Sequence, residues 1–493
     1  MAGVVLEVAR EYDFERKLHC FVGDNATSND NQFIEGLNES PHINFGSENR
    51  IRCAGHIINL VVKATIYGSG ISKFEEELSQ AAPMDQFQLF RRYGVVGKLH
   101  NFVNAVCASH RRRELFLATQ KDIMDEDSLF EQCTLQLRQD GGVRWHSVYL
   151  MMLRCLELRE PIKRFIRRLR AESSEDRSEA NYDPLTDGLT EDEWDEVSEL
   201  VNFLQAPFEM TRRLEGSNSV SGFGSLWQTL VNLQVLWRHY RSSYDYGSSP
   251  YFQSAVSFGL EKLNTYFERL VLDPTPSFYA IATALHPGLR LVWFKGAWKD
   301  FPSWHSKAEK SVRTAFKQYV DAEVDQEVLE EPISQPSVRL RQPGKSNRSS
   351  LYEDTIAVDL HLLTGSKSHK RQKRVSQLDE YFNDIQTDFM SASPAYRQLL
   401  NDPWRWWLED GRNRYPIVFK MAIDYLSIPS TSCECERVFS SARRTITCDR
   451  NNLSGSLIEA LQLQKSWLRR GVVDSGLIKL QCHIENLQNA CAD

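Results

Sequence analysis

The alternation of apolar and polar residues near the N-terminus predicts a small unit that mixes helix and strand. Val5, Val8 and Ala9 recur at helical spacing between residues 4 and 12, so we expect a helix there. Leu18–Val22 is a short apolar run rich in β-forming residues that stops at a Gly-Asp-Asn turn signal, which predicts a strand. A second short strand is expected at Ile51–Cys53, leading into a buried helix at 57–64. The pattern is that of an α/β unit with only two strands.

Helical spacing of apolar residues continues from about residue 78 to residue 317. The clearest stripe opens at Trp145 and recurs at Tyr149, Met152 and Leu156. It resumes after Pro161, which is therefore expected to begin a second helix or to kink the first. This long part of the chain is expected to be mostly helical.

Two polar stretches interrupt the helical pattern. Residues 171–188 are acidic and rich in Ser, which indicates a loop. The loop ends at a helix start, where Thr190 and Glu193 form a capping box and Leu189 with Trp194 fits a hydrophobic staple. Residues 321–374 are rich in Pro, Ser and charge, which is typical of a disordered or partly ordered linker. Order is expected to resume near Leu378.

Composition narrows the class of protein without identifying a function. The 493 residues correspond to about three domains at roughly 150 residues each. The net charge of −7 excludes a uniformly basic chain, so any DNA contact must come from local basic patches. The ten Cys are scattered, and neither a secretory signal nor a long apolar run is apparent. These features predict a soluble intracellular protein with reduced thiols and no membrane partner.

Two carboxylates stand at positions suited to a metal ion. Asp24 follows the strand predicted at 18–22, and a carboxylate held at a strand end suits a hard divalent cation such as Mg²⁺. The alternative is a turn Asp that hydrogen-bonds its own backbone. Glu436 lies in STSCECERVFSSARRT, where Arg437, Arg443 and Arg444 make the surroundings basic. The alternative for Glu436 is a structural ion pair.

Two further pairs of residues could contact a ligand. Cys53 and His56 have the C-x-x-H spacing of half a zinc site, but a structural zinc ion needs four ligands and no second pair is nearby. The alternative is a buried Cys and a hydrogen-bonded His at a strand–helix junction. Arg144 and Trp145 place a phosphate-binding cation beside a ring that can stack on a base. By periodicity alone, Trp145 is a core residue that opens a helix.

Four segments, DNATSND, RCAGHIINLVVKA, RWHSVYLMMLRCLELR and STSCECERVFSSARR, occur in this order along the chain. Together they make it resemble the hAT superfamily of DNA transposases, of the fungal Restless-like type. The resemblance covers nearly the whole chain, and the block Ser432–Arg450 is its most specific part.

The resemblance implies an α/β plus all-α fold. A partial RNase H-like core is expected at 1–75, with the second catalytic Asp and the C-x-x-H motif. A large α-helical insertion domain is expected at 76–320 and a partly disordered linker at 321–375. The helical C-terminal dimerisation region, in which the chain returns to the core, is expected at 376–493.

The resemblance also implies a metal-dependent chemistry. In the family, two Asp and one Glu hold two divalent ions, Mg²⁺ or Mn²⁺, that activate the attacking hydroxyl and stabilise the leaving oxygen of a phosphodiester. Asp24 matches the second Asp and Glu436 matches the Glu, so these are the expected catalytic and metal-binding residues.

The family also supplies expectations for DNA contact. Cys53 and His56 match the C-x-x-H motif beside the active site, and Trp145 matches the Trp that stacks on a flipped base. Together with Arg144, they are the expected DNA-binding residues.

The first catalytic Asp is where this sequence departs from the family pattern. That Asp should lie on the first core strand, well upstream of Asp24, yet only Asp13 precedes Asp24, in a linker. The first three core strands and the family's N-terminal zinc finger are also missing from the sequence, which predicts an N-terminal truncation. Losing one preorganised catalytic group costs about 10²–10³ in rate, so we expect no transposase activity from the chain as given. The alternatives are a domesticated dimeric DNA-binding or regulatory protein, and an active cut-and-paste transposase whose start lies upstream of Met1.

A helix near the C-terminus is expected to form a subunit interface. Leu457, Ile458, Leu461 and Leu468 recur on one side of it, and the alternative is packing against Trp404–Trp407 within the same chain. The resemblance favours the subunit interface, so a second copy of the chain is an expected partner.

The expected location is the nucleus and the expected ligand is the DNA of transposon ends, both because of the family. The basic run Lys367–Arg374 fits a nuclear import signal or a DNA-tracking patch, with a solvated linker as the alternative.

Overall fold

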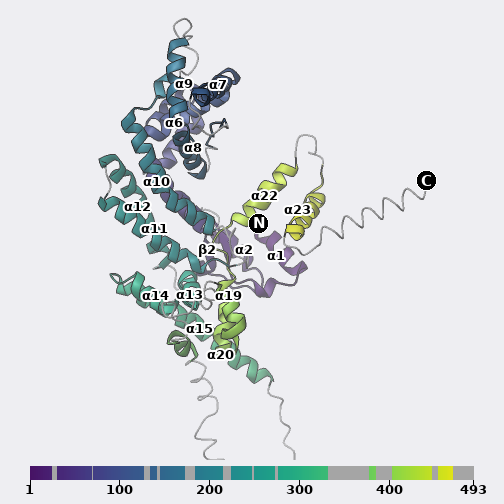
Figure 1. Ribbon diagram of the computed structural model, residues 1–493. Coiled ribbons are helices and arrows are strands. Elements are labelled where there is room, and N and C mark those ends of the chain that lie inside the picture. The colour runs from purple at the N-terminus through teal and green to yellow at the C-terminus, as the bar shows by residue number, and fades with distance from the viewer. Residues whose placement is uncertain are drawn as a thin grey trace, which may run out of the picture. The chain divides into compact units, whose positions relative to one another are not determined.

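The computed structural model describes residues 1–24, 30–68, 70–126, 134–140, 145–172, 184–214, 224–246, 249–271, 276–330, 377–384, 402–446 and 453–469. The chain divides into two units, Met1–Thr431 and Ser432–Asp493, each of which is described by itself. Helices dominate both units (Figure 1). The strands that the structure describes form one sheet of two strands. In the described part of the chain, no helix is long and apolar enough to cross a membrane.

The two strands pair in parallel, as a strand–helix–strand unit requires. β1 (Phe21–Gly23) and β2 (Arg50–Arg52) pair with Val22 opposite Ile51, and α2 (Asp30–Leu37) lies between them in sequence. The strand predicted at 18–22 forms at 21–23. A strand extends only where a neighbour supplies backbone partners, and β2 begins at Arg50.

The N-terminal helix α1 (Ala2–Glu11) packs on a small separate cluster. Leu6 and Ala9 are buried there against Leu37, whereas Val8 is 41% exposed. The predicted helix is therefore present, and Val5 and Ala9 of its predicted apolar face pack on the cluster, whereas placing Val8 on that face was wrong. Short 3₁₀ turns at Glu15–Lys17 and Ser47–Asn49 lead into the two strands.

The main core of the first unit forms around α3 (Ala54–Tyr67), whose side chains Ile57, Ile58, Val61 and Val62 are fully buried. α12 (Pro250–Val271) and α10 (Glu191–Leu214) pack against α3. α11 (Trp227–Tyr246), the helix that precedes α12 in the chain, packs against α12, and Figure 1 shows the two helices side by side.

One edge of the sheet is completed by a side chain from a distant helix. Tyr279 lies on α13 (Phe278–Leu285), and its hydroxyl accepts a hydrogen bond from the backbone nitrogen of Arg52 at 2.6 Å. The same hydroxyl donates to the backbone oxygen of Arg52 at 3.1 Å. The outer edge of β2 is therefore paired at Arg52 without a third strand.

The predicted insertion contains further helices besides these. They are α4 (Ile71–Gln80), α5 (Pro83–Arg91), α6 (Gly94–Ala108), α7 (His110–Glu126), α8 (Trp145–Glu157), α9 (Arg159–Glu172), α14 (Arg290–Ala297) and α15 (Pro302–Glu330). Pro161 lies in the first turn of α9, which confirms that it begins a second helix rather than continuing the first. α15 continues to Glu330, so the first ten residues of the segment predicted as a linker are helical.

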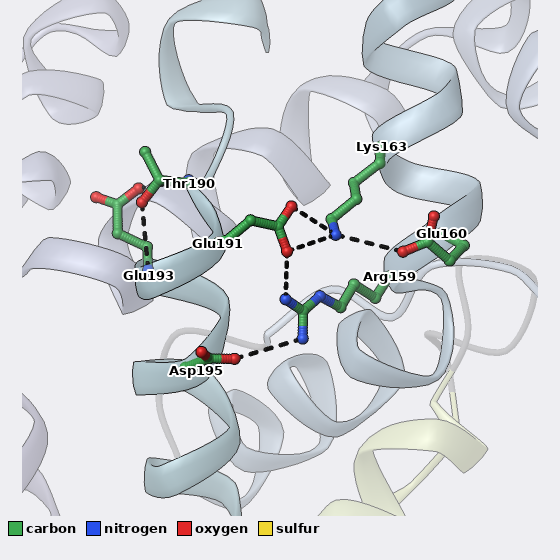
Figure 2. A network of polar contacts seen from close by, with 7 residues as sticks. All are labelled: Arg159, Glu160, Lys163, Thr190, Glu191, Glu193 and Asp195. Carbon is green, nitrogen blue, oxygen red and sulfur yellow. Dashed lines mark hydrogen bonds and ion pairs between the residues drawn. The ribbon is translucent and has the colours of Figure 1, made fainter. Parts of the chain in front are cut away.

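The start of α10 has the predicted cap. The backbone nitrogen of Thr190 donates to Glu193 at 2.9 Å, and the backbone nitrogen of Glu193 donates to the Thr190 hydroxyl at 3.3 Å. A 3₁₀ turn at Pro184–Asp187 precedes it. Figure 2 shows this cap beside a second network, in which Glu191 accepts from Lys163 and Arg159 of α9. These bonds link the starts of α9 and α10.

The aromatic segment after residue 402 is buried in the first unit. It forms α19 (Pro403–Trp406), a π-helical turn at Trp407–Gly411 and α20 (Arg412–Arg414). Trp406 and Trp407 are fully buried, and both contact Tyr381 of the helical stretch 377–382. Residues 377–382 are helical, which agrees with the ordered structure predicted near Leu378.

The chain then returns to the core. After α21 (Pro416–Leu426), the backbone oxygen of Ser430 accepts a hydrogen bond from the backbone nitrogen of Ala54 at 2.8 Å, at the start of α3. Gly224 packs beside this return, with φ +72° and an added Cβ only 1.6 Å from the Leu426 carbonyl oxygen. Only glycine fits there.

The described residues of the second unit form a helical hairpin. α22 (Cys433–Thr445) and α23 (Gly455–Arg469) are joined by hydrogen bonds from Gln462 to Thr445 and from Lys465 to Ser441. Ser441 is buried on α22 where α23 packs.

Candidate functional site

Asp24 lies directly after β1 and is exposed. Its backbone oxygen accepts a hydrogen bond from the Arg50 guanidinium at 2.6 Å, and Arg50 Nε lies 2.6 Å from an Asp30 carboxylate oxygen. The Arg50 side chain is only 6% exposed. Arg50 thus ties the carboxyl end of β1 to the start of α2, and it holds Asp24 at the strand end where the sequence pattern predicts it.

A cleft of about 830 Å³ opens beside this strand end. It is lined by β1, by the first residues of α1 and by α2, and three carboxylates, Asp24, Asp30 and Glu39, face it. Asp30 is already ion-paired with Arg50. Within the described ranges, no three His, Cys, Asp or Glu side chains are grouped so that they could hold a metal ion. The described donors therefore do not by themselves fit a two-metal centre, and we derive no metal-dependent step from them.

Cys53 and His56 lie where β2 passes into α3. Cys53 is 2% exposed, and its backbone nitrogen donates to the Gly23 oxygen at 2.8 Å, which extends the pairing of the two strands. His56 is half-buried in the first turn of α3. The described residues bring no further pair of ligands to them, which favours the junction interpretation over a zinc site. Their DNA contact stays a prediction.

Two arginines, Arg50 and Arg52, lie on β2. Burial lowers the pKa of Arg52, and the neighbouring guanidiniums of Arg50 and Arg269 lower it further. Arg50 is buried and ion-paired with Asp30, so Arg52, which is half-buried, is the cation of β2 that a phosphate could reach.

Trp145 is a core residue in this structure. It is 1% exposed and packs among His146, Tyr149 and Phe208, with ring centroids 4.4 to 6.4 Å away. A base could stack on it only after these neighbours move apart, so its base-stacking role stays a prediction. Arg144 lies outside the described residues, as do the run Lys367–Arg374 and most of the predicted linker.

Glu436 lies in the first turn of α22 and is half-buried. The Ser432 hydroxyl approaches its carboxylate at 3.5 Å, while the neighbouring Glu434 pairs with Arg437 at 3.4 Å. Glu436 belongs to the second unit and Asp24 to the first. Whether these two carboxylates act together therefore stays a prediction.

The hairpin of the second unit exposes apolar side chains on both helices. On α23, Leu457, Leu461 and Leu468 are each more than a third exposed, and Ile458 is half-buried. The remaining exposed apolar side chains of the hairpin are Val438, Phe439, Ile446, Leu463 and Trp467, of which Phe439 is 73% exposed. In the alternative partner for the leucines, the Trp404–Trp407 segment, Trp406 and Trp407 are buried within the first unit.

A second cleft lies among α11, α12 and the start of α15. No motif in the sequence predicted it. Its lining includes Trp237, Asn264, Phe267, Phe301 and Trp304. These residues come from segments up to 67 positions apart (237 to 304), so only the packing of the helices brings them together.

Comparison with known proteins identifies two regions of the chain. Residues 384–468 match the hAT family C-terminal dimerisation region, and residues 51–203 match the RNase-like helical domain of ZBED1. The first match contains α22, most of α23 and the buried tryptophans.

Similar proteins come from fungi and plants. The chain is 24% identical over 481 residues to a protein of Talaromyces stipitatus named as the transcriptional regulator tpeD, which covers 94% of this chain and 47% of that protein. It is 23% identical over 337 residues to the zinc finger BED domain-containing protein DAYSLEEPER of Arabidopsis thaliana, covering 67% and 41%. It is 23% identical over 473 residues to a protein of Zea mays named as an AC transposase, covering 93% and 49%. The chain thus spans about half the length of the curated relatives it matches.

Proposed function

Because the chain belongs to the hAT family of transposase-related proteins, we propose that it is a nuclear protein that self-associates through α22 and α23 and binds DNA. We further propose that the chain of 493 residues does not cleave DNA strands without a further carboxylate.

The exposed apolar surface of the hairpin carries the proposal of self-association. Soluble proteins rarely leave several large apolar side chains exposed together, and such surfaces mark interfaces. Phe439, Leu457, Leu461 and Leu468 lie within the segment that matches the dimerisation region. A second copy of the same hairpin offers the same apolar side chains, as a two-fold interface requires.

Light scattering on the purified chain tests the interface. We expect a dimer at micromolar concentration, and a monomer for the double variant Phe439→Glu, Leu461→Glu, because burying two carboxylates in an apolar interface is unfavourable. The matched control is Val292→Glu, since Val292 is 62% exposed on α14 in the first unit. A monomeric parent chain, or a double variant that remains as dimeric as the control, would overturn the proposal.

DNA binding is supported by the family and by the half-buried Arg52 of β2. The relatives are named as a transposase, as zinc finger proteins and as a transcriptional regulator. Fluorescence anisotropy with labelled duplex DNA measures the affinity and its dependence on salt. We expect the affinity to fall steeply as salt rises, because phosphate contacts release counterions. The variant Arg52→Gln should reduce the salt dependence, whereas an affinity insensitive to both changes would contradict the proposal.

Catalysis rests on the RNase H-like interpretation of β1, α2 and β2. In that interpretation, Asp24 and Glu436 would hold Mg²⁺ or Mn²⁺ together with a third carboxylate, and the divalent ions would polarise the phosphodiester. Neither the matched motifs nor the described residues supply that third carboxylate. We therefore expect no metal-dependent strand cleavage by the purified chain. Clear cleavage that Glu436→Gln abolishes would refute this and favour an active transposase.

A regulatory role without catalysis is the second candidate. It is favoured by the similarity of 94% of the chain to a protein named as a transcriptional regulator. Binding to one DNA sequence with high preference over others, in the absence of cleavage, would support this candidate.

A further inference from the structure

The cleft between α11, α12 and the start of α15 has a volume of about 410 Å³. That size lies within the range of sites that take small organic groups. Its walls are formed by Trp237 of α11, Asn264 and Phe267 of α12, and Phe301 and Trp304 at the start of α15. All these residues belong to the first unit, so the cleft is defined within that unit alone.

Aromatic rings form a stack that ends in solvent. Trp304 stacks with Phe267, with ring centroids 5.9 Å apart and planes at 21°, and with Phe301, at 4.6 Å and 19°. Phe267 is 2% exposed, whereas Phe301 is 40% exposed. The stack therefore runs from the core to a ring that presents area to the solvent. A further flat ring can extend it.

Polar groups frame the stack. The Trp237 indole nitrogen donates to the Asn264 side-chain oxygen at 2.8 Å, which fixes the orientation of the Asn264 amide and leaves its nitrogen as a donor. Gln234, a second amide, also lines the cleft. Amides of this kind can pair with the donor and acceptor edge of a planar heterocycle.

Charged groups stand at the rim. Arg238 and Lys299 line the cleft and are exposed, and neither makes an ion pair in the part of the chain that the structure describes. Glu268 and Asp300 line it too. The cations suit a phosphate next to a stacked base, while a carboxylate can accept from an exocyclic amino group. An apolar side chain of a peptide would use the rings but not the amides or the cations.

We propose that this cleft binds an unpaired nucleobase of DNA, stacked on Phe301 at the solvent end of the ring stack, with Arg238 and Lys299 contacting the adjoining phosphates. The inference rests on the proposed function of DNA binding. It assigns base stacking to an exposed platform, whereas Trp145, the ring expected to stack, is buried in this structure.

A fluorescent base analogue gives the direct test. A single-stranded oligonucleotide carrying one 2-aminopurine loses fluorescence when that base stacks on an aromatic ring. We expect quenching by the full chain. The variants Phe301→Ala and Phe301→Leu should abolish the quenching and weaken binding by about 5- to 100-fold, the range for loss of one base–aromatic stack. Phe301→Leu keeps an apolar side chain, so its effect reports stacking rather than packing.

Two controls separate the cleft from other surfaces. Phe258 is 38% exposed on α12 outside the cleft, so Phe258→Ala should leave the quenching and the affinity unchanged. Arg238→Gln combined with Lys299→Gln should weaken binding at low salt and reduce its salt dependence. Glu268→Gln should strengthen binding, because it removes a charge that repels phosphate.

The outcomes distinguish this inference from the proposed function. If the chain binds neither duplex nor single-stranded DNA, the proposed function fails, and this inference fails with it. If it binds duplex DNA but quenches no base analogue, the inference alone is refuted. If quenching occurs and Phe301→Leu behaves like Phe258→Ala, the base stacks elsewhere and the cleft is not its site. Loss of quenching in both Phe301 variants with retained duplex binding is the expected result.

Discussion

Removing one hydroxyl from the first unit should loosen the edge of its sheet. Tyr279 is 3% exposed, and its hydroxyl both accepts from and donates to the backbone of Arg52. Burial raises the pKa of Tyr279 far above its usual value, so the hydroxyl keeps its proton at neutral pH and can make both bonds. Phe at this position keeps the ring and its packing but leaves the backbone N–H and C=O of Arg52 without this partner.

The size of the effect follows from these two bonds. A buried polar group left without a partner costs about 1–3 kcal/mol. Arg52 is half-buried, so part of that cost is relieved by water, and we expect Tyr279→Phe to destabilise this edge by about 2 kcal/mol in total. That corresponds to roughly a 30-fold change in the equilibrium of local opening.

Amide hydrogen exchange at residues 50–53 measures that opening directly. A local probe is preferable because a protein of two units need not unfold in one step. The matched control is Tyr266→Phe, since Tyr266 is 5% exposed and its hydroxyl has no hydrogen bond among the residues described. We expect roughly 30-fold faster exchange in Tyr279→Phe and little change in the control. Equal exchange in the two variants would refute the reasoning that a side chain completes this sheet.

Three further predictions concern stability. Burial lowers the pKa of His286 to about 3, whereas the pKa of a histidine in the unfolded chain is about 6.5, so between these values only the unfolded chain takes up the proton. The free energy of unfolding should therefore fall by about 2 kcal/mol between pH 6.5 and pH 5. Urea unfolding at both pH values measures this fall, which should be smaller in His286→Gln. Gly97→Ala places a Cβ 1.7 Å from the Phe90 backbone oxygen and should lower the free energy of unfolding by about 3 kcal/mol. Gly3→Ala in α1 places its Cβ where nothing lies within 4 Å and should raise that free energy by about 0.5–1 kcal/mol. Equal unfolding curves for the two variants would contradict this. Asp187 is fully buried and paired with Arg91, so Asp187→Ala should cost about 3 kcal/mol, while Glu191→Gln in the exposed network of Figure 2 should shift the unfolding midpoint only at low salt.

Helix starts, helix caps and membership of a family could be predicted from the sequence, because the residues that indicate each of them lie close together in the chain. The capping box at Thr190, the helix that Pro161 begins and the apolar side of α23 each depend on neighbours within one or two helical turns. The motif order that indicated the hAT family agrees with the match at 384–468.

The candidate site was only partly predictable, because its geometry depends on residues far apart in the chain. The position of Asp24 at a strand end was predicted, but its support by the buried Arg50 was not. Trp145 was predicted both as a core residue and as a stacking platform, and only its packing against Phe208 distinguishes the two in this structure.

The sequence by itself determined that the chain is mostly helical, where α9 and α10 begin, and which family the chain resembles. Only the tertiary structure decided that β1 is limited to three residues, that Tyr279 pairs the edge of β2 from 227 positions away, and that Phe301 extends a stack begun by Phe267. The physical reason is that periodicity records which side of an element is apolar, whereas partners for backbone groups and exposed rings are set by which elements pack together.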